Sequence, residues 1–310
     1  MRKIKRMMLF FMAMCMVLSL ISCGEEEDDK PGKKKKDKTE VTWWGRDEEE
    51  PAPEPTPIPT TDGEVASGAE IENEVPAADL EVETEPEAEP EVITMATNAY
   101  FKPYEYYEGD KIVGIDAEIA EAMAAKLGKE LVIQDMQFDS ILTAVQTGSV
   151  DFGMAGMTVT EERLESVNFT SSYATGVQSI IVKEGSPITT VDDLYGDVTY
   201  KVGVQLGTTG DSYSTDDFGA ENVSQFANGN EAVMALIGGA VDCVIIDNQP
   251  AKALVEANEG LAILDTAYAD EEYAICVAKE NEELLASLNA AIEELIADGT
   301  VDAIIAKYIK

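Results

Sequence analysis

The segment 151–163 contains the residue on which the functional prediction rests. Its sequence, DFGMAGMTVTEER, indicates a buried strand, a loop and a helix that begins after Thr160 as N-cap residue. Arg163 lies in the first turn of that helix, and no arginine follows Arg46 except this one. A guanidinium holds a carboxylate by two parallel hydrogen bonds, so we interpret Arg163 as the group that binds the carboxylate of a small ligand. The alternative is an ion pair on its own helix, with Glu161, Glu162 or Glu165.

The composition excludes several kinds of site. The chain has no histidine, which removes every mechanism that depends on Ser–His, Cys–His or histidine–metal chemistry. The formal net charge of −39 argues against a nucleic-acid partner, because phosphate binding needs clustered lysines and arginines. The four cysteines match no zinc or redox motif, and we expect Cys243 and Cys276 to be buried free thiols rather than a disulfide. We expect no catalytic residue, no metal and no cofactor.

The N-terminus has the features of an exported lipoprotein. A basic start precedes the apolar run Met7–Ile21, which is short for a membrane-spanning helix and typical of a signal peptide. The sequence Leu20-Ile21-Ser22-Cys23 resembles the bacterial lipobox, and this resemblance implies that residues 1–22 are removed and that Cys23 carries the lipid anchor. The alternative is an uncleaved anchor with an incidental cysteine. Residues 23–92, which are rich in Glu and Pro, are predicted to form a disordered tether.

From residue 93 onward, strands alternate with helices at the spacing of an α/β fold, with largely parallel sheets covered by helices on both faces. Three loops follow predicted strands where helices begin: Asn98–Tyr104, Gly156–Arg163 and Gln205–Asp211. Asp247 ends a fourth strand. Open α/β sheets bind ligands at such strand ends. The groups assembled there suit a zwitterion, with its carboxylate at Arg163 and its ammonium at Asp247.

Several segments carry a resemblance to a known family. In chain order they are Ala96–Asn98, Phe101–Tyr104, Gly114–Ile119, Gly156–Arg163, Gly203–Thr209, Val244–Asp247, Asp298–Thr300 and Lys307-Tyr308. They resemble the bacterial extracellular solute-binding proteins of ABC transporters, polar amino-acid type (family 3). The resemblance implies a type II clamp of two lobes, 93–172 with 273–310 and 173–272, joined by two hinge crossings that close the lobes on the ligand.

The resemblance also implies how the ligand's backbone groups are held. Arg163 would bind the α-carboxylate, assisted by Thr158, the backbone at Gly156, and Thr209 at the start of a helix. Asp247 would pair with the α-ammonium. The alternative is that the two threonines cap turns and that Asp247 is the N-cap of the helix that follows it.

The remaining predicted contacts concern the ligand's side chain. Phe101 and Phe138 would enclose it between their rings, although Phe138 alone fits a core position equally well. Asn98 stands where many relatives have aspartate, and Gln205 stands where a polar or basic residue reads the side chain. These two neutral residues favour a polar or neutral amino acid.

The function implied is that of an extracytoplasmic, lipid-anchored and monomeric binding protein. It would deliver a free amino acid to an ABC permease and its ATPase. One alternative is an enzyme of the dehydratase or lytic type on the same fold, whose bases would be carboxylates or lysines. Another is a ligand-sensing or adhesive surface lipoprotein that works through its tether.

Overall fold

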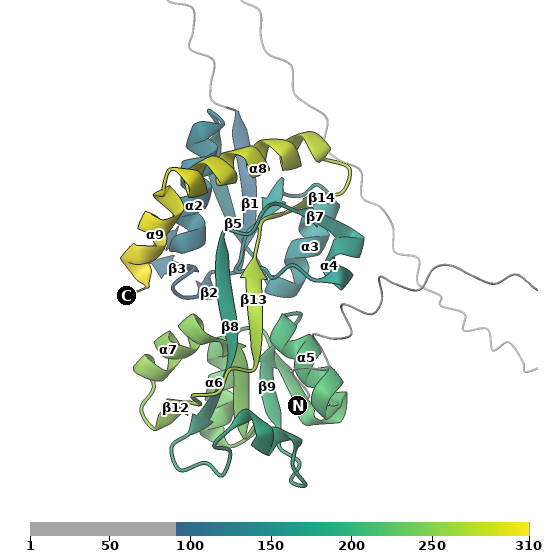
Figure 1. Cartoon of the computed structure of the whole chain (residues 1–310), viewed down its shortest axis with the longest axis vertical. Coiled ribbons are helices and arrows are strands. Elements are labelled where there is room, and N and C mark those ends of the chain that lie inside the picture. The colour runs from purple at the N-terminus through teal and green to yellow at the C-terminus, as the bar shows by residue number, and fades with distance from the viewer. Residues whose placement is uncertain (1–90, 310) are drawn as a thin grey trace, which may run out of the picture. The chain divides into compact units, whose positions relative to one another are not determined.

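The computed structural model describes residues 91–309, so the predicted signal peptide, Cys23 and the predicted tether lie outside the described part. The described residues form two α/β lobes that are joined by paired strands (Figure 1). Within residues 91–309, no helix combines the length and the apolar character needed to cross a membrane.

The first lobe is built on a five-stranded sheet in the order β5-β1-β6-β14-β7. Its strands are β1 (Val92–Thr97), β5 (Glu130–Asp135), β6 (Phe152–Gly153), β7 (Val167–Phe169) and β14 (Cys276–Ala278). Strand β1 is parallel to β5 and β6, whereas β14 is antiparallel to β6 and β7. A small antiparallel sheet precedes the first helix and consists of β2 (Tyr100–Phe101), β3 (Glu105–Glu108) and β4 (Lys111–Val113).

Helices cover the sheet of the first lobe. They are α2 (Ile115–Lys126), α3 (Phe138–Gln146), α4 (Glu161–Ser166), α8 (Glu282–Ala297) and α9 (Thr300–Tyr308). Helix α2 buries one face, on which Ile115, Ile119 and Met123 recur every fourth residue and are all fully buried. The C-terminal helices α8 and α9 pack against α2, so the last residues of the chain return to the first lobe (Figure 1).

The second lobe has its own sheet in the order β10-β9-β11-β8-β12, and β13 also pairs with β8. The strands are β8 (Ala174–Lys183), β9 (Val202–Gln205), β10 (Val223–Phe226), β11 (Cys243–Asp247), β12 (Leu261–Ile263) and β13 (Ala269–Tyr273). The helices are α5 (Thr209–Phe218), α6 (Gly229–Gly238) and α7 (Asn248–Ala257), with short 3₁₀ turns at Val191–Tyr195 and Ala220–Asn222.

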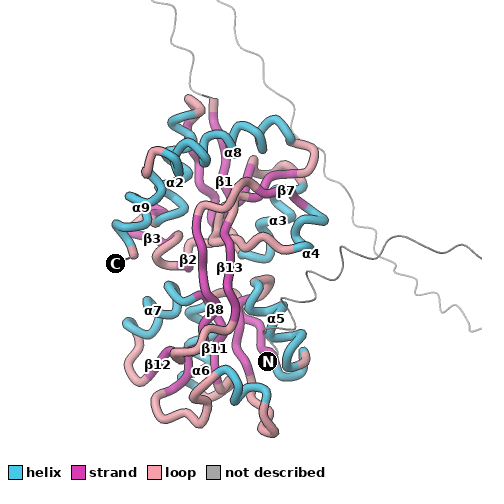
Figure 2. The backbone as a smooth tube through the Cα atoms, viewed as in Figure 1, coloured by secondary structure: helices cyan, strands magenta, loops and turns pink. Residues whose placement is uncertain are grey.

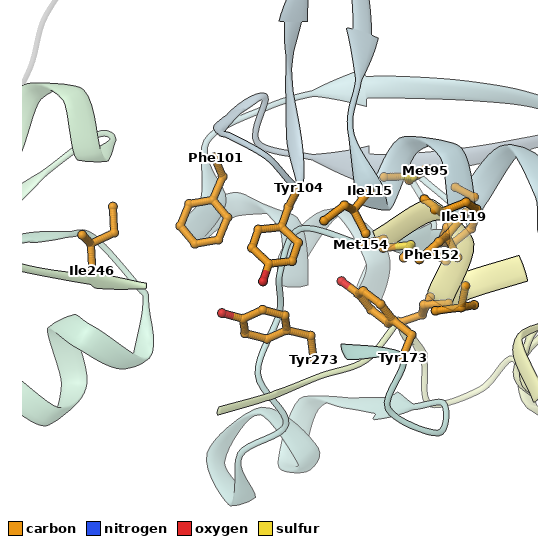
Figure 3. Close-up of a cluster of buried hydrophobic side chains, with 14 of the residues drawn as sticks. Met95, Phe101, Tyr104, Ile115, Ile119, Phe152, Met154, Tyr173, Ile246 and Tyr273 are labelled. Atoms are coloured by element: carbon orange, nitrogen blue, oxygen red, sulfur yellow. The ribbon is translucent and has the colours of Figure 1, made fainter. Parts of the chain in front are cut away.

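Strands β8 and β13 connect the lobes. They pair in antiparallel register from Ala174–Tyr273 to Gln178–Ala269, and both run between the lobes (Figures 1 and 2). A pair of adjacent strands can bend at their ends while the packed lobes remain rigid, which is the arrangement of a hinge. The buried rings of Tyr104, Tyr173 and Tyr273 lie beside this connection, between the core of the first lobe and Ile246 of the second (Figure 3).

The structure differs from the sequence prediction in the direction of several strands. We expected largely parallel sheets, but both sheets are mixed: β14 is antiparallel to its neighbours, and β8 is antiparallel to β11, β12 and β13. The reason is that the chain passes between the lobes twice, through β8 and through β13. Strands added when the chain enters or re-enters a lobe run antiparallel to the parallel strands of its βαβ units. The small sheet β2–β4 was also missed, since the sequence analysis assigned its first residues to a loop.

Two local predictions are confirmed. Thr160 is the N-cap of α4, and its hydroxyl accepts a hydrogen bond of 3.1 Å from the Arg163 amide. Cys243 and Cys276 are free and buried, and burial raises the pKa of each thiol to about 12. Thiols with such pKa values are unreactive, in keeping with a packing role.

We predict that Ile119→Ala lowers the free energy of unfolding by about 2–5 kcal/mol, because it removes a fully buried side chain between α2 and the sheet. The matched control is Ile296→Ala in α8, whose side chain is 40% exposed and should change the stability by less than about 1 kcal/mol. Urea unfolding followed by circular dichroism measures both. Equal losses would contradict the assignment of α2 to the core.

Candidate ligand-binding site

The structure brings all nine predicted site residues to the lining of one cavity between the lobes. They are Asn98, Phe101, Phe138, Gly156, Thr158, Arg163, Gln205, Thr209 and Asp247, and the lining also includes Glu105, Ala155 and Thr208. The free volume is about 10 Å³, which is room for about one water molecule. The lobes are therefore closed, and a small solute can enter only when they separate.

Arg163 is the central polar group of this cavity. Its side chain is only 8% exposed, and one guanidinium nitrogen, Nη1, donates to the carbonyl oxygen of Thr158 at 2.7 Å. Its guanidinium carbon lies 5.4 Å from the centre of the Phe138 ring. Among the described residues, no carboxylate oxygen lies within the 4.0 Å of an ion pair with Arg163, so the alternative of a salt bridge along its own helix is not realised. Burial lowers the pKa of this guanidinium below its usual range.

Two hydrogen bonds across the cavity join the lobes. Nη2 of Arg163 donates to the carbonyl oxygen of Gly207 at 3.1 Å, and Nε2 of Gln205 donates to Oδ1 of Asn98 at 2.9 Å. Arg163 and Asn98 belong to the first lobe, whereas Gln205 ends β9 and Gly207 follows that strand in the second. The predicted site residues therefore also hold the closed state together.

Gly156 and Phe101 show why the loop after β6 has this sequence. Gly156 adopts a φ of +53°, and a Cβ atom there would lie 2.8 Å from the Phe101 ring. Its amide donates to Oδ2 of Asp116 at 2.8 Å, which fixes the loop to the start of α2. A larger residue would displace the aromatic wall of the cavity, so glycine is required by both backbone and space.

Asp247 supplies a carboxylate on the other side of the cavity. It is 7% exposed, its Oδ1 accepts a hydrogen bond from the Tyr273 hydroxyl, and its Oδ2 accepts one from Nε2 of Gln178 at 2.7 Å. Asp247 is the N-cap residue of α7, as the alternative prediction had it, but its side chain makes no capping hydrogen bond to the helix. Burial, and then the nearby Glu271 carboxyl, raise the pKa of Asp247 well above its usual range.

The two predicted threonines differ in what they contribute. Thr158 offers its backbone to Arg163, as described above, and its hydroxyl lines the cavity side of the loop. Thr208, and not Thr209, is the N-cap of α5, and its hydroxyl accepts from the Asp211 amide at 3.3 Å. Thr209 instead opens the helix, where the first amides lack acceptors within the helix and favour an anionic group.

Glu105 is a site residue that the sequence analysis missed. It lines the cavity from β3, is fully buried, and neither of its oxygens has a hydrogen-bond partner within residues 91–309. Burial, and then the neighbouring Asp116 carboxyl, raise the pKa of Glu105 well above its usual range. The sequence did place Glu105 directly after the predicted ligand loop Asn98–Tyr104. An acidic residue in such a polar stretch is equally typical of a solvated surface charge, however, so the position alone did not identify it.

The arrangement defines a two-lobed binding protein for a small zwitterion. One buried cation and two buried carboxyls, those of Asp247 and Glu105, line the same closed cavity together with aromatic rings, and no reactive nucleophile lies among its described lining residues. Residues 91–309 also contain no group of three or more acidic or cysteine side chains placed to hold a metal ion.

Comparison with known proteins agrees with this class. The model of the bacterial extracellular solute-binding proteins, family 3, matches residues 93–310. The chain therefore belongs to this family. It is 32% identical over 223 residues to the arginine-binding extracellular protein ArtP of Bacillus subtilis (strain 168), a match that covers 70% of this chain and 85% of ArtP.

Two solved structures have the same fold and are at least 30% identical to this chain in sequence. An ancestral arginine-binding protein bound to glutamine is 39% identical, with a TM-score of 0.66 over 70% of this chain and 97% of the other. The ancestral amino-acid-binding protein AncCDT-1, a precursor of cyclohexadienyl dehydratase, is 30% identical, with a TM-score of 0.64 over 71% of this chain and 96% of the other. The two lobes are thus those of a type II periplasmic-binding-protein-like clamp.

We predict that Arg163→Lys weakens amino-acid binding on the order of 100-fold, because lysine cannot form the two parallel hydrogen bonds to a carboxylate. Isothermal titration calorimetry measures the affinity. The surface variant Lys126→Ala, which removes a cation of α2 that pairs with Glu294, is the control and should bind normally. Unchanged affinity in Arg163→Lys would show that the guanidinium does not hold the ligand.

Asp247→Asn should weaken binding of an amino acid about tenfold or more, because the amide removes the charge that faces the ammonium. Binding of the des-amino analogue should change far less. The same calorimetric titration with both compounds tests this difference, and equal losses would contradict the ammonium assignment.

Proposed function

We propose that the chain captures a free amino acid between its two lobes and presents the closed, loaded form to the permease of an ABC importer. The observation that carries this proposal is the buried pair of opposite charges at the cavity, Arg163 and Asp247, neither of which has an ionic partner within 4.0 Å among the described residues. A buried charge without a counter-ion is costly, and the carboxylate and ammonium of an amino acid would compensate both at once.

The side-chain subsite suits a ligand that ends in N–H donors. Glu105 offers two oxygens without partners, and the Asn98–Gln205 hydrogen bond beside it can be exchanged for bonds to the ligand. A neutral amide and a guanidinium both carry such donors. The polar or neutral amino acid favoured by the sequence therefore remains one predicted ligand class, and a cationic amino acid is the other. The relatives named above, which include an arginine-binding protein bound to glutamine, support this range.

The anchoring scheme completes the proposal. Membership of an extracellular family supports a location of the binding lobes outside the cytoplasm. We infer that residues 1–22 are cleaved as a signal peptide, that Cys23 carries the lipid, and that residues 23–92 tether a monomeric clamp 93–310 to the membrane, near its permease and ATPase.

The second candidate function is an enzyme on the same clamp, which the likeness to a precursor of a dehydratase favours. Its acid or base would be Glu105 or Asp116. Burial raises the pKa of Asp116 to about 6, where a carboxyl can exchange protons near neutral pH. Recovery of every bound compound unchanged after prolonged incubation supports the binding protein, whereas turnover supports the enzyme.

A thermal-shift screen of the purified protein against the twenty amino acids tests the proposed function. A ligand at 100 times its dissociation constant adds about 2.7 kcal/mol of stability, which corresponds to a rise of several degrees in Tm. We expect a selective rise for one or a few amino acids that carry side-chain N–H groups. A flat response across the panel would contradict amino-acid capture.

The raised pKa of Glu105 predicts that pH separates the two kinds of ligand. Below that pKa the carboxyl is neutral and no longer attracts a cation, so the affinity for L-arginine should fall by up to about tenfold per pH unit as the pH decreases. The affinity for L-glutamine should fall less. The ratio of the two affinities between pH 5 and 8 is the measurement, since Asp247 affects both ligands alike. A constant ratio, or no change of slope in Glu105→Gln, would contradict the role of Glu105.

A further inference from the structure

The hinge strand β13 has two buried side chains on one of its faces. Glu271 and Tyr273 are buried, whereas Asp270 and Glu272 are exposed. Alternate residues of a strand share a face, so the Glu271 side chain projects to the same side as Tyr273, whose hydroxyl donates to Asp247. Glu271 therefore faces the predicted ammonium subsite and not the solvent.

The strand register brings Glu271 close to the Asp247 carboxylate. Glu271 lies directly opposite Gly176 of β8. A Cβ atom at Gly176 would collide with the Tyr273 hydroxyl and would lie 2.9 Å from Oδ1 of Asp247. Directly opposed residues have Cβ atoms about 4.5–5.5 Å apart. The carboxylate of Asp247 thus occupies the space above Gly176, next to the Glu271 side chain.

The Glu271 carboxyl has no partner of its own. It is 3% exposed, and neither oxygen has a hydrogen-bond partner within residues 91–309. Burial raises the pKa of Glu271, while the Thr158 and Thr209 hydroxyls and the Arg163 guanidinium act in the opposite direction. The two threonine hydroxyls therefore lie beside the carboxyl, and both of its oxygens keep lone pairs that can accept bonds from a ligand.

We propose that Glu271 is a second carboxylate of the amino-group subsite, which receives the ligand's α-ammonium together with Asp247. The inference rests on the proposed function, because the ammonium comes from an amino acid whose carboxylate is bound at Arg163. An ammonium has three N–H donors. Both Asp247 oxygens already accept one hydrogen bond, from Tyr273 and Gln178, and the free oxygens of Glu271 complete the set of acceptors.

The position of Glu271 also links this subsite to closure. Its neighbours Thr158 and Thr209 belong to the first and the second lobe, and Glu271 itself lies on a strand that joins them. An ammonium held by Glu271 and Asp247 draws the hinge strand toward the second lobe. A ligand without an amino group cannot do this, so we expect it to bind without closing the lobes fully.

A consequence for protons follows from the charges that face Glu271. These are Asp247 on β11, Arg163 on α4 and Asp270, the exposed residue that precedes Glu271 on β13. The neutral Tyr273 hydroxyl lies beside them. Two buried carboxyls that face one another share protons, and an arriving ammonium displaces them. Binding of an amino acid should release protons, and binding of its des-amino analogue should release fewer.

The test compares Glu271→Gln with the control Glu272→Gln, the adjacent, exposed glutamate of the same strand. Calorimetric titrations use L-arginine, L-glutamine and 5-guanidinovaleric acid, the des-amino analogue of arginine, in two buffers of different ionisation enthalpy. We expect Glu271→Gln to weaken whichever amino acid binds about tenfold or more, to change 5-guanidinovaleric acid less than about threefold, and to reduce the protons released. Glu272→Gln should match the wild type.

Four results would overturn the inference. The first is equal weakening of L-arginine and 5-guanidinovaleric acid in Glu271→Gln, which would indicate a general effect on closure. The second is equal proton release by both compounds in the wild type, a measurement that stands even if the variant does not fold. The third is the absence of binding of any of the twenty amino acids to the wild type, which would overturn the proposed function as well. The fourth is normal binding of an amino acid with an unaffected Glu271→Gln, which would overturn this inference alone.

Discussion

The constraint on which the structure depends is the burial of charge between two lobes. Arg163 is removed from water, yet within the described residues its guanidinium contacts carbonyl oxygens of Thr158 and Gly207 rather than a carboxylate. Carbonyl groups satisfy its hydrogen bonds without neutralising its charge. The Asp247 carboxyl is buried nearby and accepts hydrogen bonds from Tyr273 and Gln178, whereas the oxygens of Glu105 and Glu271 are buried without a hydrogen-bond partner among the described residues. Such a cavity is costly when empty, and a zwitterion lowers that cost on both sides, so closure and ligand recognition depend on the same interactions.

The fold places these charges by means of loops at strand ends and a two-stranded hinge. Arg163 is fixed by the cap of α4, and Asp247 by the end of β11. Gly156 and Gly176 leave space where the Phe101 ring, and the Tyr273 hydroxyl with the Asp247 carboxylate, approach the backbone. Each lobe has its own sheet and packed helices, so we expect the lobes to move as units while β8 and β13 bend. In this proposal, strands β8 and β13 carry both the motion and part of the recognition.

The sequence was informative where one residue type has one suitable role. A single arginine in the folded part and a carboxylate at a strand end sufficed to predict that Arg163 and Asp247 share a site, whereas the role of Gly156 was implied by the family resemblance. The alternation of strands and helices predicted the α/β lobes, but strand direction in the mixed sheets depends on which lobe the chain re-enters, and local patterns do not record this. Glu105 and Glu271 were missed for a related reason: in a chain with 61 acidic residues, only burial distinguishes a functional glutamate from a surface one.

The account is tested most directly by the position of a bound amino acid in a crystal structure of the protein with its tightest ligand. We predict that both α-carboxylate oxygens lie within hydrogen-bond distance of the Arg163 guanidinium nitrogens, in place of the carbonyl oxygen of Gly207. The α-ammonium should lie against Asp247, with the side chain between Phe101 and Phe138. A ligand found outside this cavity, or one bound while Arg163 keeps both of its carbonyl partners, would contradict the claim that the buried charges exist to recognise an amino acid.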